Sequence, residues 1–497
     1  PAFPSQKLAQ PMAPLSVDVV LLSGQSARIF GDPDLTIQEL RQNAQQQLGV
    51  KLLDLFLGHK RLEPWSTLKD LDQLENGQVV SASVWQPKLC SSRHSDSFAF
   101  IADDGILFGD PLVAPMERLE LTDVRDVRMS ADAFAALRAD GSVHCWGGFF
   151  SGGHLGAMRQ ELYQVRQLEA SQRAFGALRA DGRVVTWGDV VFGGDSSEVA
   201  DELVEVSCLK ASRRAFAAIV GAARSVVTWG DGAFGGDCSA VQDQLVDVVQ
   251  LHATERAFAA LTACGRVVTW GDAIYGGVCP AALQKGKVLM IQASQRAFAA
   301  YSKELGVVSW GDPDFGGDSR FINLGHGHIL EMEATAGAFA ALLDTGTVLC
   351  WGHHDLGGHL SDETRELLVQ QQRLHRLVAS NGAFVALGET DLVSWGNHFG
   401  GADLDACASL SKVEDLQGSA SSFMALSSDG ALITWGRGIR NGFADKMEHL
   451  RDEWIPEDED LEVPNIDGVE NHDDDDVKKT LDATKGLEKD LAEAKSF

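Results

Sequence analysis

Residues 248–272 read VVQLHATERAFAALTACGRVVTWGD and decide the fold of most of the chain. Three short apolar runs, at 248–253, 257–261 and 265–272, are separated by polar or glycine-containing turns, which is the pattern of three β-strands joined by hairpins. The stretch ends in Trp-Gly-Asp, and the Trp-Gly dipeptide recurs every 40 to 44 residues with a Phe upstream of each copy. The tryptophans are Trp146, Trp187, Trp229, Trp270, Trp310, Trp351, Trp395 and Trp435. A degenerate copy with Phe108-Gly109 precedes them, so the sequence predicts nine repeats, of which the first is poorly formed.

Each repeat needs neighbours, because a three-stranded sheet of this composition has two apolar faces and one copy cannot bury both. Stacking the copies buries both faces, and closing the stack into a ring protects its ends. Large Trp and Phe residues alternate with Ala and Gly, so an aromatic ring of one sheet can meet a small residue of the next. We therefore predict a mainly β chain in which residues 87–440 form a β-propeller of about seven to nine short blades. One way to close the ring is for residues 96–110 to complete the last blade.

The repeats resemble the regulator-of-chromosome-condensation family of propellers. The resemblance rests on the Ala-Leu, Asp-Gly-x-Val and Trp-Gly elements, as at Asp181-Gly182 and Trp187-Gly188, and the repeat length resembles the family's short, three-stranded form. Two elements depart from the family pattern. Ala174-Phe175 stands where His-Ser or His-Thr is usual, and Phe234-Gly235-Gly236-Asp237 replaces a Gly-Gln-Leu-Gly loop. The resemblance implies protein binding, and it extends to non-catalytic regions of HECT-type ubiquitin ligases.

The segment 15–86 has a different pattern, in which strands flank a single helix. Its first two apolar runs predict a hairpin, and 52–57 and 78–85 predict two later strands. Residues 36–39 (TIQE) have the sequence of a capping box, which opens a helix that Gly49 ends. The sequence therefore predicts a small α+β domain before the propeller.

This segment resembles the ubiquitin family, whose fold is the β-grasp. The matching stretches are Leu22-Ser23-Gly24, Leu35-Thr36-Ile37, Gly58-His59-Lys60-Arg61-Leu62-Glu63 and Ser66-Thr67-Leu68-Lys69-Asp70-Leu71. Leu22 and Leu55 match two positions of the family's hydrophobic binding patch, whereas the third falls near the polar Ser83. The resemblance implies that Leu22 and Leu55 contact a partner. No Gly-Gly pair follows residue 85, so the domain is not expected to be conjugated to substrates.

The charge of the chain limits its partners. The formal net charge is −29, which argues against binding to nucleic-acid backbones and to anionic membranes and favours basic partners or none. Residues 1–14 are expected to be a flexible leader. Residues 441–497 are expected to be a mostly disordered tail, because 452–476 hold thirteen acidic residues and no Lys or Arg.

The eight cysteines contain no CxxC pair, which favours a reducing compartment and gives no support for a zinc ribbon. We expect a cytoplasmic or nuclear protein, with organelle import left open because the chain begins at Pro1.

Four arginines occupy the same position in successive repeats, two residues before the Phe. They are Arg173, Arg214, Arg256 and Arg296. If the repeats stack, these guanidinium groups form a row on one face, where they either pair with nearby Asp residues between blades or contact an anionic partner. The Asp residues that follow Trp-Gly are explained by turn chemistry better than by calcium.

No metal site, cofactor or catalytic residue is expected. The histidines at 326, 328, 353, 354 and 359 lack supporting ligands at suitable spacing, and no nucleophile elbow, P-loop or dinucleotide fingerprint is present.

We therefore hypothesise a non-catalytic scaffold or adaptor, not an enzyme, in ubiquitin-linked protein turnover. The ubiquitin-like domain would bind a pathway component while the propeller holds a client protein. Two alternatives stay open: a guanine-nucleotide exchange factor for a small GTPase, and a structural subunit of a larger complex. Exchange factors of this family use a wedge inserted in one blade, for which the longest interval of 44 residues leaves no room.

Overall fold

A computed structural model describes residues 15–71, 77–92, 95–102, 105–109, 121–284, 287–371, 373–389, 391–403, 413–427 and 432–436. The predicted leader at 1–14 and the predicted tail at 441–497 lie outside the described residues. Everything below concerns the described residues within Pro1–Ala444, the first of the two units into which the chain divides. Within the described ranges, no helix has the length and the apolar character required to cross a bilayer.

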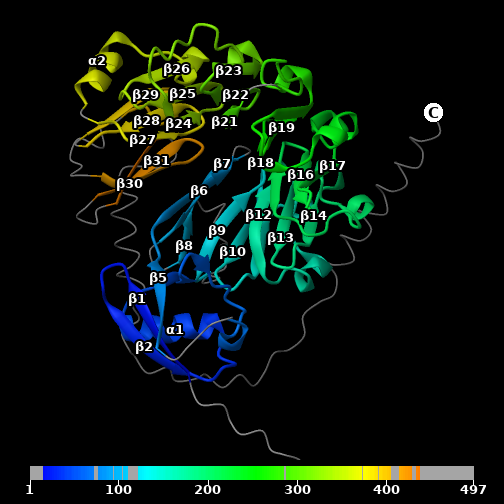
Figure 1. The fold of residues 1–497 in the computed structure, drawn as a ribbon, viewed down its shortest axis with the longest axis vertical. Helices are drawn as coiled ribbons and strands as arrows, with labels where there is room; N and C mark the ends of the chain where they lie inside the picture. Colours follow the sequence, from blue (N-terminus) through cyan, green and yellow to red (C-terminus); the bar gives the residue numbers. More distant parts are fainter. Residues whose placement is uncertain are drawn as a thin grey trace, which may run out of the picture. The chain divides into compact units, whose positions relative to one another are not determined.

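The N-terminal unit is a five-stranded sheet with one α-helix packed on it (Figure 1). The strand order is β2 (Ser26–Gly31), β1 (Leu15–Leu21), β5 (Gln78–Val84), β3 (Leu52–Leu57) and β4 (Lys60–Arg61), and only the β1–β5 pair is parallel. Helix α1 (Ile37–Leu48) buries Ile37, Leu40 and Ala44 against the sheet.

The predicted ends of helix α1 are confirmed. The Thr36 hydroxyl accepts the Glu39 N–H at 3.2 Å, and the Glu39 carboxylate accepts the Thr36 N–H at 2.8 Å, which is the capping box. Gly49 ends the helix in the left-handed region at φ 69°. The 3₁₀ turn η1 (Leu68–Asp70) follows β4.

Within the described ranges the repeats form nine separate three-stranded antiparallel sheets, one for each predicted copy. They are β6–β7–β8 (Lys88–Ser92, Ser95–Ile101, Leu107–Gly109), β9–β10–β11 (Val124–Met129, Ala133–Arg138, Val143–Gly147), β12–β13–β14 (Val165–Ala170, Ala174–Arg179, Val184–Gly188), β15–β16–β17 (Cys208–Ala211, Ala215–Val220, Ser225–Gly230), β18–β19–β20 (Val248–Ala253, Ala257–Thr262, Val267–Gly271), β21–β22–β23 (Val288–Ala293, Ala297–Ser302, Gly306–Gly311), β24–β25–β26 (Ile329–Ala334, Ala338–Leu343, Val348–Gly352), β27–β28–β29 (Arg376–Ala379, Ala383–Leu387, Leu392–Gly396) and β30–β31–β32 (Val413–Gly418, Ser422–Ser427, Leu432–Gly436).

A mainly β chain of repeated three-stranded sheets is consistent with a propeller, as predicted from the repeat. The expectation that residues 96–110 complete the last blade is wrong, because β7 and β8 pair with β6 in a sheet of their own.

The recurring aromatic residues hold neighbouring sheets together. Phe258 and Trp270 lie opposite each other on β19 and β20 with stacked rings, and the eight such pairs of the described repeats have centroids 5.3 to 5.5 Å apart. Phe258 also lies against Gly235 of the preceding repeat, where an added Cβ would come within 2.6 Å of its ring. The Trp270 indole donates to the Gly235 carbonyl at 3.0 Å. The Phe-Gly-Gly loop is therefore a packing surface for the next sheet.

A buried hydroxyl fixes each of these loops. The Ser212 hydroxyl accepts the Ala215 N–H at 3.1 Å and donates to the Phe234 carbonyl at 2.8 Å. Corresponding bonds join the loops of six other repeats through Ser130, Ser171, Thr254, Ser294, Thr335 and Ser380. The loop after the third strand is thereby tied to the turn between the first two.

The first strands of neighbouring sheets contact one another along the chain, and β30 of the last sheet also contacts β6 of the first. The Gln417 side chain makes this last contact, because its amide nitrogen donates to the Pro87 carbonyl at 3.1 Å and its oxygen accepts the Leu89 N–H at 2.8 Å. Gln167 makes the corresponding pair of bonds to Leu209 between two interior sheets.

Candidate interaction surface

The predicted arginine row lies at the end of the sheets where the Trp-Gly loops also lie. Each arginine comes just before the second strand of its repeat and pairs with the Asp that follows Trp-Gly in the same repeat. The N···O distances are 3.9 Å for Arg173–Asp189, 3.5 Å for Arg214–Asp231, 3.7 Å for Arg256–Asp272 and 3.4 Å for Arg296–Asp312. The ion pairs expected between blades therefore lie within each blade. The second and third strands of a repeat pair antiparallel, so the start of the second strand lies beside the end of the third.

Aromatic rings, not ion pairs, join the row from one repeat to the next. The rings come from 3₁₀ turns that follow Trp-Gly: η4 (Val190–Phe192), η6 (Gly232–Phe234), η8 (Ala273–Tyr275) and η9 (Pro313–Phe315). The Arg256 guanidinium lies 4.7 Å from the Phe234 ring of the preceding repeat and 4.9 Å from the Tyr275 ring of its own. Arg214 and Arg296 lie between two rings in the same way. Cation–π contacts thus run across four repeats.

The Asp residue of each pair has a second role, which is to start the 3₁₀ turn. The carboxylates of Asp189, Asp231, Asp272 and Asp312 accept the N–H two residues on, at 2.9 to 3.1 Å. This supports the predicted turn chemistry, in which Asp accepts local backbone hydrogen bonds. Within the described ranges no cluster of three or more potential metal ligands exists.

Large apolar side chains are exposed at the tips of these turns. We define the loop surface as the 3₁₀ turns after Trp-Gly, which are the four above with η2 (Phe149–Ser151), η10 (His354–Leu356) and η11 (His398–Gly400). Its exposed apolar residues are Phe149, Phe150, Val190, Val191, Ile274 and Phe399. A buried hydroxyl holds each of these turns, and Asp189, Asp272 and Asn397 cap three of them, so these residues are presented on a rigid support.

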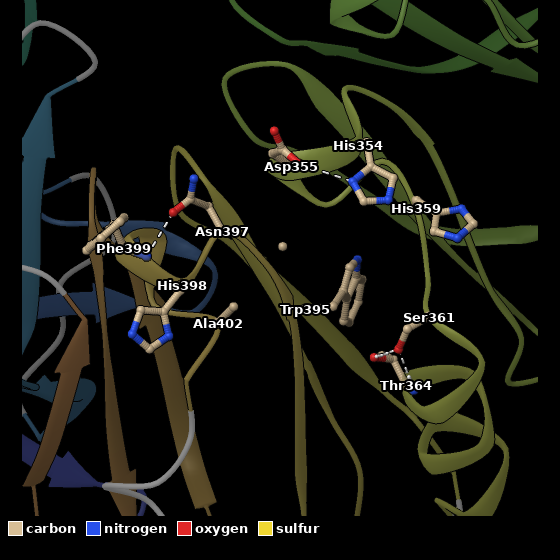
Figure 2. Close-up of a pocket in the computed structure, with 11 residues that line it drawn as sticks. His354, Asp355, His359, Ser361, Thr364, Trp395, Asn397, His398, Phe399 and Ala402 are labelled. Carbon is tan, nitrogen blue, oxygen red and sulfur yellow. Dashed lines mark hydrogen bonds and ion pairs between the residues drawn. The ribbon is translucent and has the colours of Figure 1, made fainter.

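A cavity of about 560 Å³ opens in the loop surface between η10, η11 and the start of helix α2 (Asp362–Gln370) (Figure 2). The stacked rings of His354 and His359 line one side, with centroids 5.2 Å apart, and His398 lies on the other. His354 contacts Asp355 at 3.1 Å, and His398 contacts Asp403 at 3.5 Å.

The repeats that border this cavity differ from those of the arginine row at one position. They carry Gly337 and Gly382 where the four preceding repeats have arginine, so no guanidinium side chain lies between their turns.

The two predicted contact residues of the N-terminal unit have opposite environments. Leu22 is 100% exposed in the turn after β1, so it is accessible to a partner. Leu55 is only 1% exposed and belongs to the core with Leu52 and Leu40, so its predicted role in a binding patch is wrong. The register of β3 against β5 shifts between Leu52 and Asp54, and the extra residue in the strand brings Leu55 to the inner face.

Sequence reasoning missed two sets of residues that the structure brings forward. The first is the buried Ser or Thr that precedes each Ala-Phe, whose recurrence at the repeat interval is visible in the sequence. The second is Arg125 and Arg166, which contact the N-terminal unit. Nothing in the sequence marks this second pair, because it depends on the register of single strands.

Comparison with models of known protein families and with curated proteins finds no match. Among solved structures, the chain is similar to the ectodomain of the receptor kinase CR4 from Physcomitrella patens, at 17% identity and a TM-score of 0.36 over 56% of this chain and 74% of that one. It is also similar to Prp20p from Saccharomyces cerevisiae, a protein that binds Gsp1p and histones, at 15% identity and a TM-score of 0.35 over 65% of this chain and 95% of that one.

A third similar structure is the computationally designed protein Ika8, at 15% identity and a TM-score of 0.35 over 71% of this chain and 98% of that one. Likenesses at these scores support no inference about partners or activity, so the proposals below rest on the geometry of the chain itself.

Proposed function

We propose that this chain is a non-catalytic scaffold that binds a partner protein on its loop surface. The observation that carries the proposal is the set of exposed apolar residues at the turn tips, on loops fixed by internal hydrogen bonds. Exposed apolar residues that a rigid support presents on one face are typical of protein-binding sites.

The charge around the turns favours a basic partner. Residues 189–206 contain six acidic residues and 231–247 contain four, and neither stretch contains Lys or Arg. Arg173 pairs with Asp189 and Arg214 pairs with Asp231, so each arginine neutralises one carboxylate and both stretches keep a net negative charge. An apolar surface with Lys or Arg at its rim therefore complements these loops.

Two cysteines are unsuited to thiol chemistry, whereas a hydrogen bond with Thr262 lowers the pKa of the exposed Cys264. Burial raises the pKa of Cys90 to about 11 and that of Cys279 to about 12, so both thiols are protonated at neutral pH. A nucleophilic thiol needs a pKa near or below neutrality.

We also infer that the nine sheets close into a ring and that the N-terminal unit is a ubiquitin-like domain. The contact of β30 with β6 through Gln417 supports closure. The strand order of the N-terminal sheet and the placement of α1 support the second inference. A role in ubiquitin-linked turnover follows from that resemblance alone.

The test compares proteins captured by the full chain and by a loop variant, Val190→Ser, Val191→Ser and Ile274→Ser. The matched control is Phe30→Ser with Val79→Ser, because these apolar residues are equally exposed but lie on the N-terminal unit. We expect the loop variant to capture at least tenfold less of a specific set of partner proteins than the full chain does. The control variant should capture the same amount of these proteins as the full chain. Equal capture by both variants would refute the loop surface as the binding site.

A second assay addresses the alternative function. We expect the chain to leave the rate of nucleotide release from a Ran-like GTPase unchanged. Acceleration of that release would replace the scaffold proposal with an exchange factor.

A further inference from the structure

A β-bulge interrupts the first strand in several repeat sheets and turns one residue out of the ladder. The register shift falls at the second residue of β9, β12, β18, β21, β24 and β30. The residues at this bulge position are Arg125, Arg166, Val249, Leu289, Leu330 and Glu414. Bulges commonly redirect a side chain in this way, so the bulge position is where each sheet can offer a residue to a neighbour.

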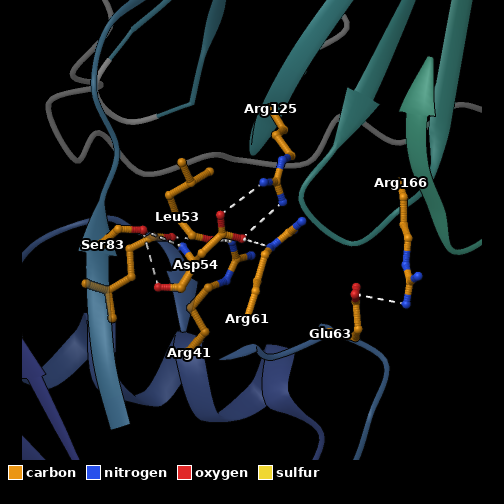
Figure 3. A network of polar contacts seen from close by, with 9 residues as sticks. Arg41, Leu53, Asp54, Arg61, Glu63, Ser83, Arg125 and Arg166 are labelled. Atoms are coloured by element: carbon orange, nitrogen blue, oxygen red, sulfur yellow. Dashed lines mark hydrogen bonds and ion pairs between the residues drawn. The ribbon is translucent and has the colours of Figure 1, made fainter. Parts of the chain in front are cut away.

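The two bulge arginines bind carboxylates of the N-terminal unit (Figure 3). Arg125 donates to both oxygens of Asp54 at 3.0 Å, a bidentate pair, and Arg61 of β4 donates to the same carboxylate at 2.7 Å. Arg166 lies 3.0 Å from Glu63. The Asp54 side chain is only 11% exposed, so its pair with Arg125 is shielded from water and from salt.

Apolar contacts accompany these pairs. Leu53 packs against the core of the first two repeat sheets, which includes Trp85 and Val127. The Trp65 ring comes within 2.9 Å of the position that a Cβ would take on Gly141, so this turn fits the ring only with glycine.

A buried arginine lies beneath the same edge. Arg41 donates to the carbonyls of Leu52 and Leu53 at 3.3 and 3.2 Å. Burial lowers the pKa of Arg41, while the charges of Asp123, Asp54 and Asp140 act to raise it. Carboxylates from both the N-terminal unit and the repeats thus surround this guanidinium.

We propose that Arg125 and Arg166 form a latch that holds the β3–β4 edge of the N-terminal unit closed against the repeats. The closed latch masks Asp54, Glu63 and Leu53, and opening it exposes these three side chains while Arg61 stays paired with Asp54. That edge fits a protein surface carrying a pair of cations that replace the two arginines. The latch lies at the end of the sheets where the first strands begin. The loop surface lies at the opposite end, where the first and third strands end, so the two sites are separate.

The bulge position carries a different kind of residue in three later sheets. Val249, Leu289 and Leu330 occupy the same position in three later sheets and are 40%, 52% and 59% exposed. An apolar residue cannot replace the cation that a shielded carboxylate requires. The specificity of the contact therefore lies in two residues.

The experiment uses the full chain and follows hydrogen–deuterium exchange of 52–63 and 121–128. The test variant is Arg125→Glu with Arg166→Glu, and the matched control is Val249→Glu with Leu289→Glu, which places the same charges at the same bulge position. We expect at least fivefold faster exchange of both segments in the test variant and unchanged exchange in the control.

Two further variants keep the result interpretable. Arg125→Gln removes the charge without repulsion and should open the latch partially even if the double reversal fails to fold. Glu63→Arg combined with Arg166→Glu restores an ion pair and should exchange more slowly than Arg166→Glu alone. Exchange that is unchanged in the test variant, or equally raised in the control, would overturn the latch.

Discussion

At the scale of the residue, the glycines of the Phe-Gly-Gly loops meet two requirements at once. Gly235 has φ 91°, which side chains with a Cβ adopt only under strain, and its missing Cβ makes room for Phe258 of the next sheet. The sequence showed that glycine recurs at this place. Which ring fills the space could be seen only from the packing between repeats.

We predict that Gly235→Ala destabilises the chain more than Gly221→Ala. Both glycines have a positive φ, so both variants carry backbone strain of about 1–2 kcal/mol. Only at Gly235 would the new Cβ collide with a ring, at 2.6 Å, whereas Gly221 has no atom within 4 Å. Overpacking should add about 1–3 kcal/mol.

Urea unfolding of the two variants measures this difference directly. Equal losses of stability would show that the loop moves away from Phe258 and that the close contact carries no energy.

At the scale of the element, the sequence predicted three strands in each repeat, the Trp-Gly terminus and the capped helix α1. These features follow from local patterns of two to four residues. The bulges were not predictable, because one extra residue moves every later side chain of the strand to the opposite face, and nothing in the local sequence marks where that residue is inserted. The same limit explains the error at Leu55, where the bulge in β3 places two core leucines three residues apart.

The arginine row was predicted as a row, but its contacts with aromatic rings were not. The rings come from the neighbouring repeat and from a 3₁₀ turn whose path the sequence does not fix.

We predict that Arg256→Lys lowers stability by about 1 kcal/mol, because an ammonium group cannot lie flat between Phe234 and Tyr275. Arg365→Lys on α2 is the control, since Arg365 is exposed and pairs only with Asp362 at 3.3 Å in the described structure. The measurement is the thermal midpoint of each variant. A loss as large in the control as in Arg256→Lys would mean that the stacking contributes nothing.

At the scale of the whole molecule, the contact between the last and first sheets differs from every other contact between repeats. Sheets that follow each other in sequence are also joined by the chain, whereas β30 and β6 belong to the last and first sheets, and in the described structure side-chain hydrogen bonds and packing join them. We call the contact between β30 and β6 the seam. The Gln417 side chain makes hydrogen bonds across it and also donates to Asp415 at 2.6 Å. The charge state of Asp415 therefore bears on whether the sheets stay together at this point.

We predict that the seam weakens in acid. Burial acts to raise the pKa of Asp415, but hydrogen bonds from Gln417 and Arg376 outweigh it, so the pKa lies below its usual value. A carboxyl group whose pKa is lowered by folding stabilises the folded state at pH values above its pKa in the unfolded chain, which is about 3.9. This stabilisation is lost as the pH falls through the pKa of the folded state. Protection of β6 from hydrogen exchange, normalised to the unfolded chain, should therefore fall between about pH 5 and pH 3.

Asp415→Asn should show reduced protection already at pH 6 and a weaker dependence on pH, while Asp355→Asn in the exposed turn η10 should behave as the unaltered chain. The same pH profile in all three proteins would mean that Asp415 does not hold the seam.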